Sequence, residues 1–175
     1  MSRHVAGCAE MKLIAPLFAV AAVAAALSGS ALAQNAAQIG HARAGSSCPR
    51  CNLFQADFSN AELKGRNFAG ARLRQADLSL AVMNRTNFAH TDLRDVNAYA
   101  GVFSSANFAG ADLTHASFVG AYLQGANFAG ARLTGTNFSG AELDHARGLS
   151  PRQLAEACGD AATTLPSGLR LEACR

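Results

Sequence analysis

Residues 51–145 repeat one five-residue phrase without insertion or deletion. The phrase reads Asn-Phe-Ala-Gly at residues 67–70, 107–110 and 127–130. Each phrase has one large apolar residue, which we term its centre, and usually a small residue two places earlier. A helix places apolar residues about every 3.6 positions and a strand every second one, so a strict period of five fits neither. The period predicts a chain that turns a corner every five residues, with two side chains inward and three outward.

Centres that lie twenty residues apart carry the same kind of side chain. One such column is Leu53, Leu73, Leu93, Leu113 and Leu133, and another is Phe68, Phe88, Phe108 and Phe128. A spacing of fifteen mixes residue types instead. We therefore predict four phrases in each coil of a four-sided solenoid, with neighbouring coils about 4.8 Å apart, the distance between hydrogen-bonded strands.

The phrase resembles the A-(D/N)-L-x-x phrase of pentapeptide repeat proteins. Matching copies are Ala76-Asp77-Leu78, Ala111-Asp112-Leu113 and Ala126-Asn127-Phe128. The resemblance covers residues 51–145 and implies an all-β fold, a right-handed quadrilateral β-helix, here with just under five coils. It implies no single function, because the family is a scaffold on which several functions occur. Two residues depart from the pattern: Arg66 is expected to point outward at a distorted corner, and Ala98 is an undersized centre that is expected to leave a small gap.

Residues 1–33 predict a secretory signal peptide that starts at Met11. A short basic start precedes an apolar run over residues 13–27, and a small-x-small cleavage site occupies residues 31–33. The apolar run is too short to span a bilayer comfortably, so no stable membrane insertion is expected after the signal is removed. These features predict a bacterial periplasmic or secreted protein.

The segments on either side of the repeat are expected to cover the two ends of the solenoid, where strand edges would otherwise be unpaired and the core exposed. Residues 34–50 are rich in Ala, Gly, Ser and Gln, which predicts a flexible leader that ends in a Cys cap. Residues 146–175 predict a C-terminal cap. There Ser150 and Gln153 form a capping box for a short helix over residues 151–158, and a disulfide-closed loop follows.

Four cysteines follow the predicted cleavage site, namely Cys48, Cys51, Cys158 and Cys174. An even number in an exported chain favours two disulfides, for which three pairings are possible. We favour Cys48–Cys51 with Cys158–Cys174, because the two pairs lie at opposite ends of a rigid rod. Exported proteins that this chain resembles have similar Cys-bracketed tails.

The motif Cys48-Pro49-Arg50-Cys51 also permits an alternative function, that of a thiol–disulfide redox protein, because CxxC thiols often have a lowered pKa. Such a motif belongs at a strand-to-helix turn, whereas here it leads into a solenoid. A zinc site of four cysteines fits less well, because the second pair lacks CxxC spacing. Covalent haem attachment is excluded, because Asn52 follows the motif where histidine is required.

Charge argues against nucleic acid as a partner. The full chain has a formal net charge of +3, and the repeat has 7 basic and 8 acidic residues. Some pentapeptide repeat proteins mimic duplex DNA and protect topoisomerases, but that role requires a strongly acidic rod in the cytoplasm. His90, His115 and His145 fall on three different sides, and we find no Ser/His/Asp set, phosphate loop or paired carboxylates. We therefore expect neither an enzyme nor a cofactor or metal site.

Six apolar residues at outward positions form one edge across three successive coils. They are Leu80, Tyr99 and Val119 at the end of side two, and Val82, Val102 and Tyr122 at the start of side three. Single apolar surface residues are ordinary, but contiguous ones often mark interfaces. We therefore predict a non-enzymatic, exported structural or interaction module, with this patch as the site for a protein partner or for self-association.

Overall fold

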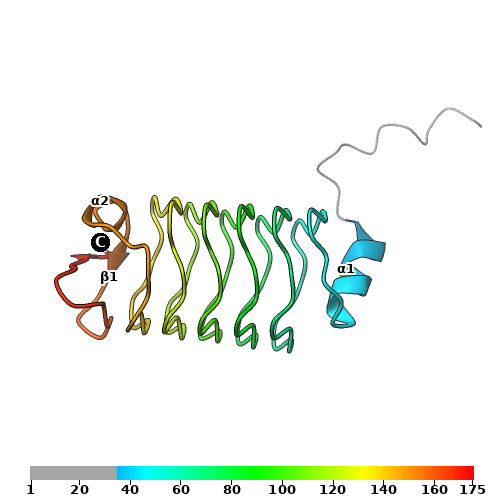
Figure 1. The fold of residues 1–175 in the computed structure, drawn as a ribbon, viewed down its shortest axis with the longest axis horizontal. Coiled ribbons are helices and arrows are strands. Elements are labelled where there is room, and N and C mark those ends of the chain that lie inside the picture. The colour runs from blue at the N-terminus through cyan, green and yellow to red at the C-terminus, as the bar shows by residue number, and fades with distance from the viewer. Residues whose placement is uncertain (1–34) are drawn as a thin grey trace, which may run out of the picture. The chain divides into compact units, whose positions relative to one another are not determined.

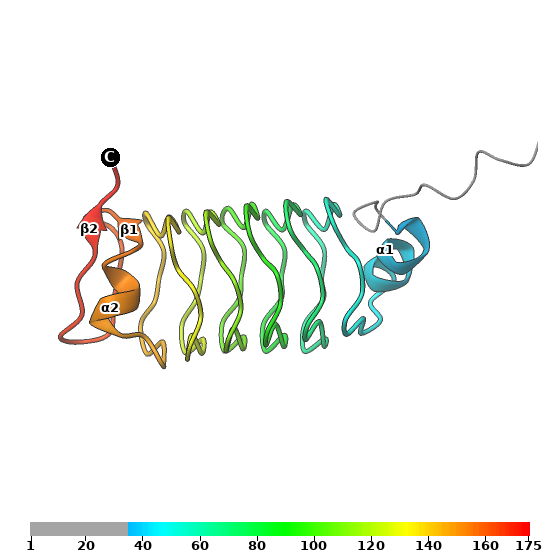
Figure 2. The ribbon, with the colours of Figure 1, turned by 90° about the horizontal axis from the view of Figure 1, so that it is seen from above.

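The computed structural model describes residues 35–175. Within this range the repeat forms a stack of coils, with helix α1 (Ala36–Arg43) at one end (Figure 1, Figure 2). Helix α2 (Pro151–Leu154) and the paired strands β1 (Cys158–Gly159) and β2 (Glu172–Ala173) lie at the other end. The predicted signal peptide, residues 1–33, lies outside the described residues.

Parallel β-bridges join residues twenty apart throughout the repeat, from Asn52↔Arg72 to Asn127↔Arg147. The main chain of each coil is hydrogen-bonded to the next, as in Leu53 N–H to the Arg72 carbonyl at 2.8 Å. These bridges confirm the twenty-residue register that the leucine and phenylalanine columns predict. They are single bridges because only a few residues run straight before the chain turns again.

The chain turns at the two residues after each centre. The second of these has a φ between +50° and +68° in every coil, as at Gln75 (+59°) and Gly70 (+67°). This left-handed conformation favours glycine, which explains the many glycines at this place in the phrase. A main-chain hydrogen bond closes each corner, for example Ala76 N–H to the Leu73 carbonyl at 2.9 Å.

The core consists of the centres and of the small residues two places before them. The phenylalanine rings stack along the axis, with centroids 5.2 Å apart between Phe88 and Phe108 and between Phe108 and Phe128. Threonine replaces alanine at a few buried inward positions, and its hydroxyl then donates to a main-chain carbonyl. Thr136 does so to Leu113 at 2.9 Å. The core therefore accepts a hydroxyl without leaving it unsatisfied.

The two residues that depart from the repeat pattern are accommodated in different ways. Arg66 is exposed although its place in the phrase is an inward one. Ala98 is fully buried. Three residues after it, a Cβ at Gly101 would lie 2.5 Å from Cε2 of Phe103, so glycine leaves room for this ring. Glycine at position 101 therefore makes room for the ring of Phe103, the centre that follows Ala98.

The structure differs from the flexible leader predicted for residues 34–50, because Ala36–Arg43 form helix α1. Asn35 caps this helix by accepting a hydrogen bond from Gln38 N–H at 3.1 Å. Ala42 is fully buried against the first coil, and Gln38 Oε1 accepts from Asn52 N–H at 2.7 Å. Docking on the open end of the solenoid therefore orders a segment whose composition alone predicts disorder.

The C-terminal segment extends the stack beyond the repeat. Ser150 caps α2 as predicted, with its Oγ 3.3 Å from Gln153 N. The helix ends at Leu154 rather than at residue 158, because the chain then pairs with the last coil. Phe138 N–H donates to the Cys158 carbonyl at 2.8 Å. The tail therefore covers main-chain groups that the last coil would otherwise expose.

Candidate functional site

The structure pairs Cys48 with Cys51 and Cys158 with Cys174, the arrangement that the sequence favours. Cys48 lies five residues before Leu53 and takes the place of a centre, while Cys51 takes the next small inward position. Cys48 N–H donates to the Asn67 carbonyl at 2.8 Å, as a residue of a regular coil does. The three-residue separation of the two cysteines thus equals the separation between a centre and the next small inward position. The repeat register alone could have predicted that both cysteines point inward.

The Cys48 end of the N-terminal disulfide is covered, whereas Cys51 is half-buried. The Cys48 residue is only 3% exposed, and its sulfur lies 3.9 Å from the Gln38 carbonyl of α1. A redox pair needs an accessible sulfur for thiolate attack. This burial disfavours the thiol–disulfide alternative.

Each coil presents four faces, and we name each face by the outward residue that precedes each centre. Face one carries Asn52, Arg72, Asp92, Asp112 and Arg132; face two carries Asp57, Asp77, Asn97, Ser117 and Asn137; face three carries Glu62, Val82, Val102, Tyr122 and Glu142; face four carries Asn67, Asn87, Asn107, Asn127 and Arg147. Among the residues that the structure describes, face three alone has apolar side chains in this column.

Asp and Asn on the other faces stabilise the corners. Their side-chain oxygen accepts a hydrogen bond from the main-chain N–H two residues later, as Asp77 does from Ser79 at 2.9 Å. The asparagines of face four also bond along the rod, for example Asn107 Nδ2 to Asn87 Oδ1 at 3.1 Å. These residues have a structural role that requires no ligand.

Face three lacks this stabilisation in its middle coils, as do single corners on other faces, such as the one after Arg132. Val82 and Val102 have no side-chain oxygen, and among the described residues the N–H groups of Asn84 and Ser104 have no hydrogen-bond acceptor. The three apolar residues of the face are bridged to one another in the order Val82, Val102, Tyr122. Glu62 and Glu142 lie at the two ends of the same column.

The structure brings the six residues of the predicted patch together. Leu80 N–H donates to the Tyr99 carbonyl and Ala100 N–H to the Val119 carbonyl, each at 2.9 Å, so the corner residues follow the same coils as face three. Tyr99 is 53% exposed, Leu80 51% and Tyr122 43%. The three valines, Val82, Val102 and Val119, are half-buried. We call these six residues the apolar patch.

Face one is charged and internally paired. Arg94 forms a two-pronged ion pair with Asp92, with both N–O distances 2.8 Å, and lies 3.9 Å from Asp112. Arg74 pairs with Asp95 at 3.1 Å. Hydrogen bonds from the Arg94 guanidinium hold the pKa of Asp92 below its ordinary value. Because Arg74 and Arg94 are paired with these carboxylates, their charges offer little to a ligand.

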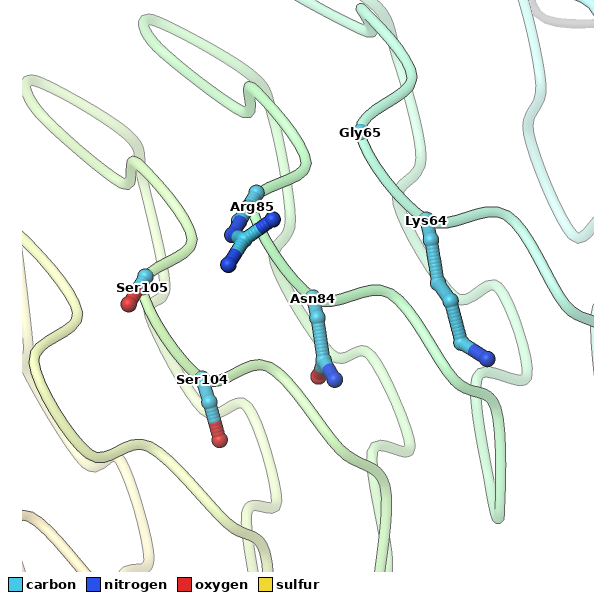
Figure 3. A pocket seen from close by; sticks show the side chains of 6 residues that line it. All are labelled: Lys64, Gly65, Asn84, Arg85, Ser104 and Ser105. Carbon is cyan, nitrogen blue, oxygen red and sulfur yellow. The ribbon is translucent and has the colours of Figure 1, made fainter.

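A groove runs along the corner between faces three and four (Figure 3). Its volume is about 500 Å³, and it is lined by Lys64, Gly65, Asn84, Arg85, Ser104 and Ser105. Lys64, Asn84 and Ser104 lie in register on three successive coils, and Gly65, Arg85 and Ser105 follow in the next register (Figure 3). The repeat pattern of the sequence did not predict this groove.

The histidines within the described residues form no shared metal site. A Cβ at Gly110 would lie 2.5 Å from His90 Nδ1, and one at Gly135 would lie 2.4 Å from His115 Nδ1. Each ring thus covers a glycine corner of the next coil. Residues 35–175 contain no cluster of His, Cys, Asp or Glu that could hold a metal ion. Nor does this part of the chain have a helix that is long and apolar enough to cross a bilayer.

Together these contacts define a scaffold of stacked repeat coils with an apolar core and varied outward side chains. The family profile described as "Pentapeptide repeats" matches residues 51–76, 67–97 and 102–140, with eight copies of the repeat. The chain belongs to the pentapeptide repeat family. No curated protein sequence matches the chain.

Solved structures of other pentapeptide repeat proteins resemble this one. The crystal structure of alr5209 from Nostoc PCC 7120 is 25% identical, with a TM-score of 0.51 over 75% of this chain and 95% of that one. AT2G44920 from the thylakoid lumen of Arabidopsis thaliana is 26% identical, covering 60% and 58% of the chains, with a TM-score of 0.28. HetL from Nostoc is 20% identical, covering 75% and 63%, with a TM-score of 0.31. The family relationship implies a right-handed quadrilateral β-helix, a fold that is generally structural rather than enzymatic.

Proposed function

We propose that the chain is a non-enzymatic, exported interaction module that presents the apolar patch to a protein partner. Its scaffold is a β-helix of just under five coils, closed at the C-terminal end by α2 and the segment after it. The observation that carries the proposal is the composition of face three. Its middle three coils have apolar outward residues, where the other faces carry mainly Asn, Asp and Arg.

The patch costs the isolated protein stability in three ways. Val82 and Val102 leave two corner N–H groups without the side-chain acceptor found at most corners of the other faces, each such bond contributing about 0.5–1.5 kcal/mol. Leu80 holds a φ of +58° at a place where Gly120 and Gly140 stand in later coils. Leu80 and Tyr99 also expose apolar surface. A binding role accounts for these residues, because contact with a partner removes that surface from water.

The size of the patch favours a segment of another protein over a second copy of the chain. It spans three coils, two spacings of about 4.8 Å. A stable homodimer needs roughly 800 Å² from each partner, which is more than an area of this size offers. An apolar helix or strand of a partner protein, by contrast, fits a narrow strip along the rod.

Two disulfides support export, because such bonds persist in oxidising compartments such as the bacterial periplasm. The burial of Cys48 beneath α1 argues against the thiol–disulfide alternative, although Cys51 is only half-buried. The nearly neutral charge of the repeat argues in the same way against mimicry of DNA.

The test replaces Val102 by Arg and Tyr122 by Glu together. The matched control places the same charges on half-exposed residues of adjacent coils near face four, Ala69→Arg with Ala89→Glu. We expect crosslinking in the native compartment to recover the same specific protein with wild type and control but not with the patch variant. All three proteins should melt at nearly the same temperature.

Two outcomes would contradict the proposal. If wild type and patch variant sediment as monomers and recover identical proteins, the patch is only surface. If the wild type sediments as a dimer that the patch variant loses, the occupant is a second copy.

A further inference from the structure

The groove beside face three has a clear sign of charge. Lys64 and Arg85 supply two cations, and none of its six lining residues is acidic. The Lys64 ammonium lies 3.6 Å from a Glu62 carboxylate oxygen, with both side chains more than half exposed. Among the described residues, the Arg85 guanidinium has no ion-pair partner. Gly65 adds open space, because nothing lies within 4 Å of where its Cβ would stand.

The groove also contains main-chain hydrogen-bond donors of a kind that an Asp or Asn side chain caps at most other corners of the repeat. The N–H groups of Asn84 and Ser104 have no acceptor among the described residues, because Val82 and Val102 replace the usual Asp or Asn. Donors of this kind favour an oxygen atom brought by a ligand.

The chain itself shows how a carboxylate binds such a corner. Asp57 Oδ1 accepts from Ser59 N–H at 2.9 Å and from the Ser59 hydroxyl at 2.6 Å. Asp112 Oδ1 accepts from Thr114 in the same way, at 3.1 Å and 2.6 Å. Ser104 offers the same two donor groups, and its hydroxyl at present donates to Gln124 Oε1 at 3.0 Å.

We propose that this groove is a carboxylate-binding site. The carboxylate oxygens accept hydrogen bonds from the uncapped N–H groups of Asn84 and Ser104, and Lys64 and Arg85 neutralise the charge. The carboxylate comes either from a free solute or from an Asp or Glu side chain of a protein. This inference does not depend on the apolar patch binding a partner.

The experiment is an NMR titration of the processed, oxidised protein that follows the amides of Asn84 and Ser104. The probes are sodium glutarate and a hexaglutamate peptide, and sodium chloride at equal ionic strength is the blank. We expect a saturable shift with at least one carboxylate probe and none with chloride. Saturation by glutarate identifies a free carboxylate as sufficient, whereas saturation by the peptide alone identifies side chains of a polypeptide.

Two pairs of variants test the two parts of the site. Lys64→Gln with Arg85→Gln should raise the Kd about tenfold or more, since each cation makes a charge-assisted contact. The matched control, Arg132→Gln with Arg147→Gln, removes the same charge from exposed positions on faces one and four and should leave the Kd unchanged.

Val82→Asn with Val102→Asn tests the uncapped donors without changing the net charge. These asparagines should cap the N–H groups of Asn84 and Ser104, as Asn87 caps Ala89 at 3.1 Å, and so should weaken carboxylate binding while leaving the fold at least as stable. The proposal is overturned if no probe saturates, or if the control pair weakens binding as much as the groove pair. Unchanged binding in the asparagine variant would show that the N–H groups of Asn84 and Ser104 do not contact the carboxylate.

Discussion

Replacing Phe108 by alanine removes a ring from the middle of the core. Phe108 is fully buried, and its ring stacks between Phe88 and Phe128 at 5.2 Å on each side. Phe103 and Phe118 contact it at 6.0 Å and 5.8 Å. A buried phenylalanine to alanine change costs about 3–5 kcal/mol. We expect the upper part of that range, because the main-chain ladder on both sides prevents neighbouring coils from closing the cavity.

Phe54→Ala is the matched control, because it deletes the same atoms at a corner. Phe54 is only half-buried and is not part of the buried core. Its truncation should cost about 1 kcal/mol or less, the value for a partly exposed apolar side chain. The difference between the two variants therefore isolates the contribution of the stacked column.

The assay is guanidinium unfolding of the oxidised proteins, followed by far-UV and near-UV circular dichroism. Coincident transitions are needed, because repeat arrays can unfold in parts. If Phe108→Ala lowers the free energy of unfolding by no more than Phe54→Ala does, the stacked-column reasoning is refuted.

Three further predictions concern single interactions. The pKa of Asp92 is lowered in the folded state by Arg94, so its contribution to stability is present above about pH 4 and lost as the pH falls through the folded pKa; the free energy of unfolding of Asp92→Asn should therefore fall less than that of wild type between pH 7 and pH 3. Leu80→Gly should raise stability by about 1 kcal/mol in denaturant titration, since glycine adopts the φ of +58° without strain; a loss would show that the leucine side chain stabilises its own coil. Replacing Cys158 and Cys174 by serine should cost about 3 kcal/mol, because the bond closes a loop with a sequence separation of 16, and mass spectrometry of an unreduced digest that pairs either residue elsewhere would contradict this assignment.

The register of the coils could be predicted because like residues stack on like. The bridge between Val82 and Val102 follows from the same twenty-residue count that aligns Leu53 with Leu73. A wrong count of phrases in each coil would have mixed leucine with phenylalanine along the axis. The twenty-residue period therefore suffices to predict that the residues of the apolar patch lie on neighbouring coils.

Helix α1 could not be predicted in the same way, because its stability comes from docking. Ile39 and Ala42 are the residues of α1 that pack on the core, too few to give a helical period. The inward position of Cys48 was available from the register, which extends five residues before Leu53. The position of the groove could not be predicted from the repeat pattern. It depends on how the side chains at one corner pack in three dimensions, which the spacing of residues along the chain does not specify.

The hydrogen-bond ladder along the rod has a mechanical consequence. The disulfides Cys48–Cys51 and Cys158–Cys174 each lie within one end of the described chain, and neither ties one repeat coil to the next. A force applied to the two ends would load the bonds of one coil at a time. Each detached coil of twenty residues would release about 65 Å of extended chain. Under tension the rod should therefore lengthen by one coil at a time, while the loops closed by the two disulfides remain closed.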